Sequence, residues 1–433
     1  VLLHYLFQKK ILSSPRLAFY PCRNDLPKLY FADLRAIWDT SRTDGNKVRL
    51  SGLAHSMDLE RAISKSIGEM LERYFLSLYK NDSLLRSSYQ DLLEKGTAAL
   101  NIFELNSFLP WQERRNPRFA KTSESPFYWV EGETMDRRVT YLPAQLVFWN
   151  YNLACDLNEP VLGHPTTNGA AGHFTRDGAI LAGLLENIQR DGFLIYWLNG
   201  ISPKRIDASL IDDDETQSML SDAERYGLKM HFLNTTSDIG VPSIMCAIVD
   251  PRTNEPVIAV GGGTGFNLKD TILHGAYEAL SVLNHAEQYE GFTISEKYEP
   301  FIDPTIGHLE RIRLWRGKKM LERLSFFING PLQTPDEFIG SSSTLDTFQK
   351  QLPYVLDTLR SMGIGYEPYV YEVRDKVLDT LGYHVVQTIV PQLIPLHLRE
   401  EMVTLNSKRL REVPAKLGYE AAVTLNPWPH PFP

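Results

Sequence analysis

Residues 168–197, NGAAGHFTRDGAILAGLLENIQRDGFLIYW, form the stretch that decides the fold of this chain. The stretch begins as a glycine-rich loop and continues as a helix that carries Glu186, Gln189 and Arg190 on one face, because residues three and four apart are neighbours on a helix surface. Apolar residues surround that face: Ile180, Leu181, Leu184, Leu185, Ile188 and Phe193. Polar groups in such a setting need partners, since burying them unpaired is costly.

The chain repeats this pattern in two other places. Glu69, Glu186 and Glu278 each stand seven residues after a small residue that is followed by isoleucine (69 − 62, 186 − 179 and 278 − 271). Glycine precedes each of the three helices, at Gly52, at Gly169 and Gly172, and at Gly261–Gly263 and Gly265. The first two copies also share a polar residue and an arginine on the turn after the glutamate: Glu72 and Arg73 in the first, Gln189 and Arg190 in the second. The third copy has Ser281 and Val282 there.

A single copy favours an ordinary amphipathic helix with a solvated Glu/Arg pair, which is worth only about 0.2–0.5 kcal/mol. Three copies, each introduced by glycine, favour a shared site. In the first copy Glu69 and Glu72 flank the apolar Met70 and Leu71, so both carboxylates lie near the core. Two close carboxylates repel unless a cation lies between them. Oxygen ligands without a Cys or His cluster suit Mg²⁺, which is commonly shared with phosphates.

Length and composition are those of an ordinary globular protein. The chain has 433 residues, 43% of them hydrophobic, enough for a large core or for two to three packed lobes. The net charge of −8 argues against nucleic acid as a partner, because phosphate binding needs a basic surface. No apolar run of about 18 residues is present to span a membrane. Cys22, Cys155 and Cys246 lie far apart, so the sequence predicts no disulfide framework, and buried, inert positions for Cys155 and Cys246. We expect a cytoplasmic protein.

The order of strand, glycine loop and helix predicts an α/β (mixed α+β) protein with mixed sheets. We expect a helix from about residue 57 with Asp58 as N-cap, a strand within residues 141–154, a helix over 212–226, paired buried strands before and after Pro251, and a strand at HVVQTIV. Residues 1–50 are expected to be an irregular or strand-bearing segment packed on the main domain. The main domain is expected over 51–413 and a proline-rich tail over 414–433.

Phosphate-binding loops of the common kinds are absent from the sequence. GGGTGFNLKD matches neither GxxxxGK[ST] nor GxGxxG, so neither a P-loop nor a Rossmann site is indicated. A nucleotide would be held here through a metal ion and arginine instead.

Four segments in this order resemble the YcaO family: SIGEMLER, NGAAGHFTRDGAILAGLLENIQRD, GGGTGFNLKDTILHGAYEAL and HVVQTIVPQLIPLH. The terminal PWPHPFP resembles the tail of its azoline-forming cyclodehydratases, and the match spans about residues 51–433. The resemblance implies an enzyme that uses ATP and Mg²⁺ to convert Cys, Ser or Thr of a ribosomally made precursor peptide into thiazoline or oxazoline. It also implies a separate leader-binding partner subunit and a flavin-dependent dehydrogenase in the same complex, with no nucleic acid or membrane.

The resemblance assigns roles to particular residues. Glu69 and Glu72 match the first metal-binding pair and Glu186 a further ligand, with Gln189 at a position where the family commonly has Glu. Arg190 matches a phosphate-facing arginine. Further nucleotide contacts are expected at Ser66, Asn168, His173 and Glu278. Departures from the family pattern are Ala54, His55 and Ser56 in place of a GKG-like loop, Lys65 at an expected small residue, and Gln387 at a common arginine.

The tail has a physical logic of its own. Pro427, Pro429, Pro431 and Pro433 fix an extended strand without amide donors, which loses little entropy when it enters a cleft. The resemblance implies that this tail reaches the active site, so the Pro433 carboxylate or His430 is expected to assist proton transfer. A disordered spacer is the alternative for a proline-rich end.

Three alternatives stay open at this point. A YcaO enzyme that forms thioamides or amidines would use the same ATP chemistry, and a noncatalytic scaffold would bind nucleotide or peptide without turnover. Arg311, Arg313 and Arg316 would either contact phosphate or lie on a solvated helix face.

Overall fold

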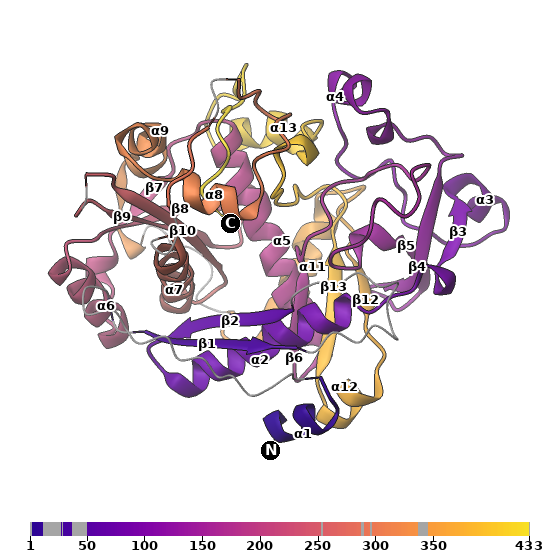
Figure 1. Cartoon of the computed structure of the whole chain (residues 1–433), viewed down its shortest axis with the longest axis horizontal. Coiled ribbons are helices and arrows are strands. Elements are labelled where there is room, and N and C mark those ends of the chain that lie inside the picture. The colour runs from indigo at the N-terminus through magenta and orange to yellow at the C-terminus, as the bar shows by residue number, and fades with distance from the viewer. Residues whose placement is uncertain are drawn as a thin grey trace.

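Helix α5 (Arg176–Leu198) is the central element of the structure, a computed structural model that describes residues 2–11, 27, 29–36, 50–252, 254–286, 290–294, 297–336 and 345–432. In Figure 1 it passes between two sheets, and it packs against strands of both. Its first half lies in an apolar cluster with Ile180 and Leu184, and its second half in another with Phe193 and Trp197. This double burial explains why the helix is apolar nearly all round.

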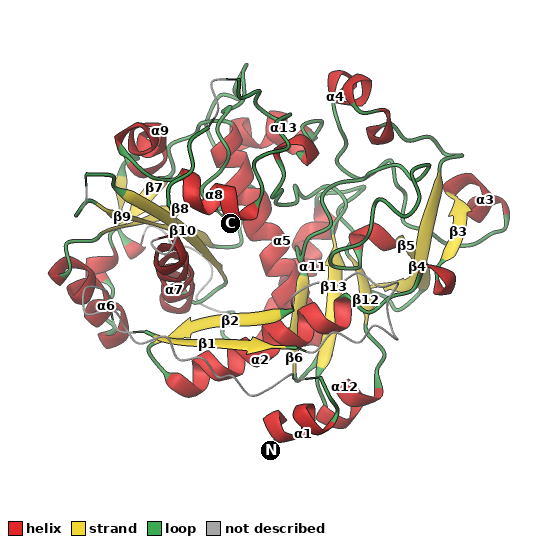
Figure 2. Cartoon of the chain, in the orientation of Figure 1, coloured by secondary structure: helices red, strands yellow, loops and turns green. Residues whose placement is uncertain are grey.

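Three sheets make up the strand framework, and Figure 2 shows helices packed around them. The smallest pairs two antiparallel strands, β1 (Tyr30–Arg35) and β2 (Ser51–Ser56). The five-stranded sheet has the order β10 (Val257–Thr264), β9 (Ser243–Asp250), β8 (Lys229–Asn234), β7 (Lys204–Ile206) and β11 (Leu332–Gln333). The six-stranded sheet has the order β3 (Leu85–Ser88), β4 (Pro126–Thr134), β12 (Tyr369–Glu372), β13 (His384–Ile389) and β6 (Ala170–His173), with β5 (Val139–Pro143) on β4.

The helices in the described ranges cover these sheets and connect them. They are α1 (Leu2–Gln8), α2 (Leu59–Leu76), α3 (Tyr89–Glu94), α4 (Pro110–Arg115), α6 (Asp214–Arg225), α7 (Leu268–Ala286), α8 (His308–Leu314), α9 (Lys318–Ile328), α11 (Phe348–Ser361), α12 (Lys376–Leu381) and α13 (Lys408–Lys416). Helix α2 lies against the small sheet and α7 against β10 and β9.

Most of the expected elements are confirmed. The mixed α/β class is correct, Asp58 is the N-cap of α2 and accepts a hydrogen bond from the Arg61 amide at 2.7 Å, and β9 and β10 pair on either side of Pro251. The strand expected within 141–154 is wrong beyond Pro143, because a 3₁₀ turn follows at Ala144–Leu146. Residues 170–173 form a short strand on β13 instead of a loop.

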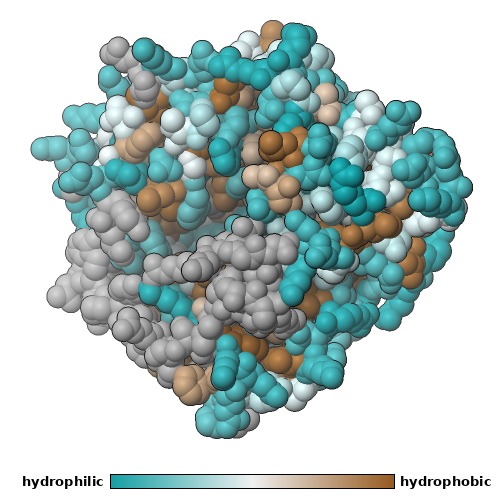
Figure 3. All heavy atoms as spheres, turned by 45° about the vertical axis from the view of Figure 1, so that its right-hand side comes forward, coloured by the Kyte–Doolittle hydropathy of each residue, from teal (hydrophilic) through white to brown (hydrophobic). Residues whose placement is uncertain are grey.

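The surface matches the composition. Among the residues coloured by hydropathy in Figure 3, most of those on this face are hydrophilic, and the apolar ones gather only in small patches, as is normal for a globular protein. Within the described ranges, no helix is both long and apolar enough to cross a membrane.

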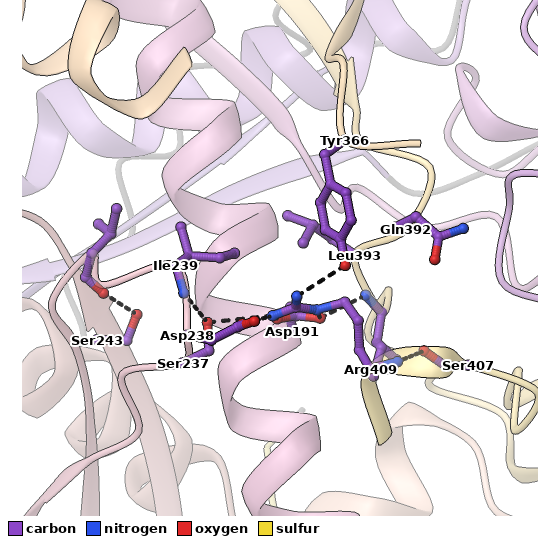
Figure 4. Close-up of polar contacts among 12 residues, drawn as sticks. Asp191, Ser237, Asp238, Ile239, Ser243, Tyr366, Gln392, Leu393, Ser407 and Arg409 are labelled. Atoms are coloured by element: carbon purple, nitrogen blue, oxygen red, sulfur yellow. Dashed lines mark hydrogen bonds and ion pairs between the residues drawn. The ribbon is translucent and has the colours of Figure 1, made fainter. Parts of the chain in front are cut away.

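A buried ion pair ties α5 to the C-terminal part of the chain (Figure 4). The Arg409 guanidinium donates to both carboxylate oxygens of Asp191, at 2.7 and 2.6 Å, and to Asp238 at 2.7 Å. The Ile394 amide also donates a hydrogen bond to the Asp191 carboxylate, at 3.1 Å. Arg409 is 1% exposed and Asp191 fully buried, so each charge depends on the other for its stability.

Replacing Arg409 therefore tests this tie. Arg409→Met leaves the buried Asp191 carboxylate without a counter-charge, and we expect a loss of about 3–5 kcal/mol in the free energy of unfolding, measured with urea. Lys416→Met is the matched control, because Lys416 binds the same Asp238 at 2.8 Å but is 54% exposed. Such surface pairs contribute about 0–1 kcal/mol. Equal losses in the two variants would contradict the assignment.

Candidate active site

The three glycine-led segments share one geometry. Gly52, Gly169 and Gly261 each stand 14 residues before a helical residue that touches them (66 − 52, 183 − 169 and 275 − 261). A Cβ on Gly52 would lie 1.9 Å from the Ser66 carbonyl oxygen, and one on Gly261 would lie 2.5 Å from that of Gly275. In the middle segment a Cβ on Gly183 would lie 2.5 Å from the Gly169 carbonyl oxygen. The glycines are therefore required for the backbones to approach so closely.

This close approach places one glutamate in each segment against a backbone amide. The Glu69 carboxylate accepts from the Leu53 amide at 2.5 Å, Glu186 from the Gly169 amide at 2.9 Å, and Glu278 from the Gly262 amide at 2.6 Å. The repeat seen in the sequence thus corresponds to a repeated hydrogen bond, which the sequence did not predict. Each carboxylate is fixed by the loop or strand that precedes its own helix.

The first and third segments face each other across a cavity of about 820 Å³. Helix α2 contributes Lys65, Glu69, Glu72 and Arg73 to its wall, and α7 contributes Glu278. Neutral and apolar groups complete the lining, among them His55, Phe174, His274, Tyr277, Val282, His308 and Tyr383. We call this the charged cavity. Its charges mix carboxylates with cations, the combination expected for a site that binds a metal ion together with phosphates.

Burial raises the pKa of the carboxylates around the charged cavity. The pKa of Glu72 is raised to about 8, first by burial and then by the neighbouring charges of Glu69 and Glu186. Burial also raises the pKa of Glu69 and of Glu278, against the opposing effects of Arg73 and Arg190 respectively. Glutamates from all three segments therefore lie close enough to repel one another, and a cation between them would relieve that cost.

The donor set fits Mg²⁺, although it is not fully assembled. Among the described residues, no three acidic, His or Cys side chains already converge at ligand distance. Glu69 is held by Arg73 at 2.5 Å, and Glu186 by Arg190 at 2.9 Å. An ionised carboxylate can accept about four hydrogen bonds or metal contacts, so each can keep its amide donor and still bind a cation. Glu69, Glu72 and Glu186 are the residues that would hold it.

Gln189 has a different environment from its counterpart Glu72. It is 5% exposed, and its amide oxygen accepts from the Arg190 guanidinium at 2.8 Å. Its side chain lies against Gly262 of the third segment. Arg190 is thereby oriented by both Gln189 and Glu186, and the metal-binding role expected for Gln189 stays a prediction.

The expected nucleotide contacts are only partly brought together. His173 lines the charged cavity, and its Nδ1 accepts from the Thr175 amide at 3.0 Å at the start of α5. Ser66 lies outside the cavity lining: it is fully buried and its hydroxyl donates to the Gly52 carbonyl at 2.8 Å, while Lys65 and Ser64 face the cavity. Asn168 lines a second, smaller cavity, whose lining shares no residue with that of the charged cavity.

The C-terminal tail is bound along the body of the protein up to Arg190. Body groups donate to tail carbonyls: Tyr298 to Pro427 at 2.9 Å, Trp197 to Trp428 at 3.0 Å and Arg311 to His430 at 3.0 Å. The Phe432 ring lies 4.2 Å from the Arg190 guanidinium, in a cation–π contact. The tail is therefore docked on the body over the described residues as an irregular segment, and Pro433 lies outside them.

His430 is packed differently from what its predicted role requires. It is fully buried, and its Nε2 donates to the His397 carbonyl at 2.8 Å. Burial, and then the charge of Arg311, lowers its pKa well below the usual value, so the ring is neutral. The charged-cavity lining does not include it. Its observed contacts hold the tail, and its part in proton transfer stays a prediction.

Two minor expectations are corrected by burial. Arg311 neither contacts the charged cavity nor lies on a solvated face, because it is fully buried and pairs with Glu400 at 2.6 Å. Cys155 is exposed instead of buried, whereas Cys246 is buried as expected. The apolar residues around Cys155 belong to an irregular loop, where the spacing of apolar residues does not predict which side chains are buried.

Tyr383 is a cavity residue that sequence reasoning missed. A Cβ on Gly68 or on Gly172 would lie 2.9 or 2.5 Å from its hydroxyl oxygen, so glycines of two segments make room for one phenol. Burial, and then the charge of Glu72, raises its pKa. The sequence signal that could have indicated this contact is Gly68 in the middle of α2. A glycine inside a helix lowers helix stability by about 1 kcal/mol relative to alanine, so its presence points to a close neighbour.

Comparisons with known proteins agree with this geometry. The family described as YcaO cyclodehydratase, ATP- and Mg²⁺-binding, matches residues 54–394. An uncharacterized protein of Methanothermobacter thermautotrophicus is 26% identical over 273 residues, 62% of this chain and 66% of that protein. A protein from the tfuA 3′ region of Rhizobium leguminosarum bv. trifolii is 32% identical over 109 residues, which are 23% of this chain and 26% of that protein.

Solved structures share the fold at low identity. A heterocyclase in complex with substrate and cofactor has a TM-score of 0.76 at 18% identity, with 100% of this chain and 57% of that chain covered. YcaO from Methanopyrus kandleri, bound with AMPPCP and Mg²⁺, has a TM-score of 0.61 at 14% identity, with 93% and 92% covered. The Escherichia coli microcin synthetase McbBCD complex with pro-MccB17 bound gives 0.64 at 16%, with 98% and 100% covered. The present chain thus spans little more than half of the heterocyclase and at most two thirds of the curated relatives.

The glycine contact can be tested by adding one methyl group. Gly52→Ala forces β2 away from α2, so we expect the Glu69 carboxylate to lose its amide donor. The expected loss is about 1–3 kcal/mol of stability, together with a reduced thermal shift on adding Mg²⁺ and ATP. Gly291→Ala is the control, since its Cβ would meet nothing closer than 3.5 Å. A full thermal shift in Gly52→Ala would refute the link between this contact and the site.

Proposed function

Because this chain belongs to the YcaO family of ATP- and Mg²⁺-binding proteins, we propose that it is an ATP-dependent cyclodehydratase that installs azoline rings in a ribosomally made precursor peptide. The observation that carries the proposal is one cavity lined by Glu69, Glu72 and Glu278 of the first and third segments, together with Lys65 and Arg73. Glu186 and Arg190 of the second segment lie outside this lining but close enough to shift the pKa of these glutamates. These carboxylates match the donor chemistry of Mg²⁺, and the cations match that of phosphate.

Bound ATP would supply the phosphoryl group that makes the reaction feasible in water. A substrate thiol or hydroxyl would lose its proton and add to the preceding amide carbon, and the former carbonyl oxygen would take the γ-phosphoryl group of ATP with release of ADP. Loss of phosphate together with the amide proton would then leave a C=N bond in the ring. Amide oxygen is otherwise a very poor leaving group.

The chain's own residues have distinct parts in this proposal. Glu69, Glu72 and Glu186 would hold Mg²⁺, which neutralises phosphate charge. Arg190, oriented by Glu186 and Gln189, would stabilise the charge that develops on the transferred group. Phe432 covers one face of that guanidinium, so the described end of the tail would act at this point of the proposed site.

We further propose that the protein acts in the cytoplasm with a separate subunit that binds the precursor leader, and that a flavin-dependent dehydrogenase oxidises the product. The relatives whose structures were solved with substrate or as a synthetase complex support an assembly of this kind. Incubation of the protein, its partner, precursor and ATP is expected to remove one water from the peptide for each ring. A precursor whose mass is unchanged after incubation in that mixture would refute the proposal.

Two other functions remain to be separated by experiment. Mass spectrometry of the product distinguishes ring formation from a thioamide or an amidine, because each changes the peptide mass differently. The docked proline tail favours ring formation, since it resembles the tail of the azoline-forming enzymes.

Glu72→Gln separates an enzyme from a noncatalytic scaffold. The change keeps the shape of the side chain but removes a charge from the proposed metal site, so we expect more than about a tenfold loss of turnover with the fold intact. Glu60→Gln, on the exposed face of the same helix, is the control and is expected to keep full turnover. A scaffold would keep its effect on the partner in both variants, whereas an enzyme would lose it in the first alone. Circular dichroism checks folding.

Removing residues 431–433 tests the tail. The truncated protein exposes Arg190 and loses the fully buried Phe432 side chain, which packs against Phe193, so we expect slower ring formation and a lower melting temperature. Val423→Ser, a change at a fully exposed residue that precedes the proline repeat of the tail, is the control. Unchanged rates in the truncated protein would refute the proposed role.

A further inference from the structure

A cluster of buried ionisable groups holds the C-terminal tail at His430. It consists of His430 itself, His397, and the ion pair between Arg311 of α8 and Glu400, at 2.6 Å. His397 is 4% exposed and the other three residues are at most 1% exposed. The lining of the charged cavity includes none of the four, so the cluster lies outside the proposed metal and nucleotide site. We call it the histidine cluster.

The His430 ring is held in its neutral form by its contacts. It lies between the rings of Phe193 and His397, with centroid distances of 5.6 and 4.8 Å. Its Nε2 carries the proton, because it donates to the His397 carbonyl oxygen at 2.8 Å and that oxygen can only accept. Its Nδ1 makes no hydrogen bond within the described part of the chain. A second proton on this ring would therefore place a charge in a fully buried position.

The charges around the cluster oppose that second proton. Arg311 donates to the His430 carbonyl at 3.0 Å, so a guanidinium is fixed beside the residue. Glu400 lies 3.8 Å from His397 Nε2, but its charge already balances Arg311. Protonation would thus make a neutral cluster positive. The other ionisable groups near the cluster are His164, Tyr298, Asp303, and Arg399 paired with Glu401.

Both histidines consequently resist protonation in the docked state. Burial, and then the charge of Arg311, lowers the pKa of His430 and of His397 well below the usual value. Contacts of His430 with backbone groups of His397 and Phe432 oppose this shift but offset only part of it.

Release of the tail would remove these constraints from His430. In water its pKa returns to about 6.5, so the released tail takes up a proton below that pH while the docked tail does not. Docking is therefore strongest above pH 6.5 and weakens as the pH falls, about tenfold in the docking constant per pH unit for one histidine. His397 loses its cover when the tail leaves and would steepen this dependence.

We propose that His397 and His430 form a pH-sensitive latch, which holds the tail against Arg190 while both rings are neutral and releases it on protonation with the body still folded. Phe432, which is fully buried against Phe193 and Arg190, leaves with the tail. Release is a property of the folded chain alone. Only its consequence, slower ring formation at low pH, rests on the proposed function.

Fluorine NMR of the full chain labelled with 5-fluorotryptophan tests the latch between about pH 7.5 and about pH 5. Trp428 stacks on Tyr298 and lies 3.3 Å from the Arg323 guanidinium, so its signal changes on release, and Trp428→Phe identifies that signal. Trp129, fully buried in β4, reports on the body. We expect the Trp428 signal to move reversibly to that of a released tail below pH 6.5, while the Trp129 signal stays unchanged.

Two variants assign the effect to the cluster. His430→Gln keeps an N–H for the His397 carbonyl but cannot be protonated, and we expect release to move at least about one pH unit lower. His397→Gln removes the second ring, is expected to act in the same direction, and decides the matter if His430→Gln releases the tail at every pH. His231→Gln is the matched control, because burial also lowers the pKa of this β8 histidine but the cluster does not include it. The control is expected to release the tail at the wild-type pH.

Three results would overturn the latch. The Trp428 signal stays docked down to pH 5, or it changes only together with that of Trp129, or His397→Gln and His430→Gln both release the tail at the wild-type pH.

The fate of the latch is separate from that of the proposed function. A tail that is released by acid, in a protein that never removes water from a precursor, would keep the latch and refute the cyclodehydratase. Ring formation by a protein whose tail stays docked at pH 5 would do the reverse.

Discussion

Contact between glycine backbone and helix backbone is the constraint on which the rest of this structure depends. At Gly52 and Gly261 no side chain fits between strand and helix, and at Gly183 none fits between helix and loop. The contact brings a loop or strand amide within hydrogen-bonding distance of a glutamate one helical turn further on. A carboxylate held in this way cannot retreat to solvent, and so three of them remain near one another despite their repulsion.

Charge is concentrated in one cavity. The lining of the charged cavity brings Glu69 and Glu72 of α2 and Glu278 of α7 together with Lys65 and Arg73. Burial raises the pKa of the three glutamates, and their mutual repulsion adds to this shift. A divalent cation between the carboxylates would offset that repulsion.

The tail shows how a proline-rich strand is recognised. Its prolines offer no amide donors, so the body supplies the donors, through Tyr298, Trp197 and Arg311. Arg311 is itself buried and balanced by Glu400. At the end of this strand Phe432 packs on Arg190, which connects the last residues of the chain to the central helix α5.

The sequence by itself determined the three glycine-led segments. Their fixed spacing of glycine, isoleucine and glutamate reflects a local backbone geometry that every copy must satisfy. It predicted the mixed fold, the N-cap at Asp58 and the glutamates of the site for that reason. Only the tertiary structure decided which neighbours those residues meet. Ser66 turned inward to Gly52, Arg311 was buried against Glu400, and Tyr383 entered the space left by Gly68 and Gly172. These outcomes depend on packing between segments far apart in the chain, and no periodicity within a single segment encodes that packing.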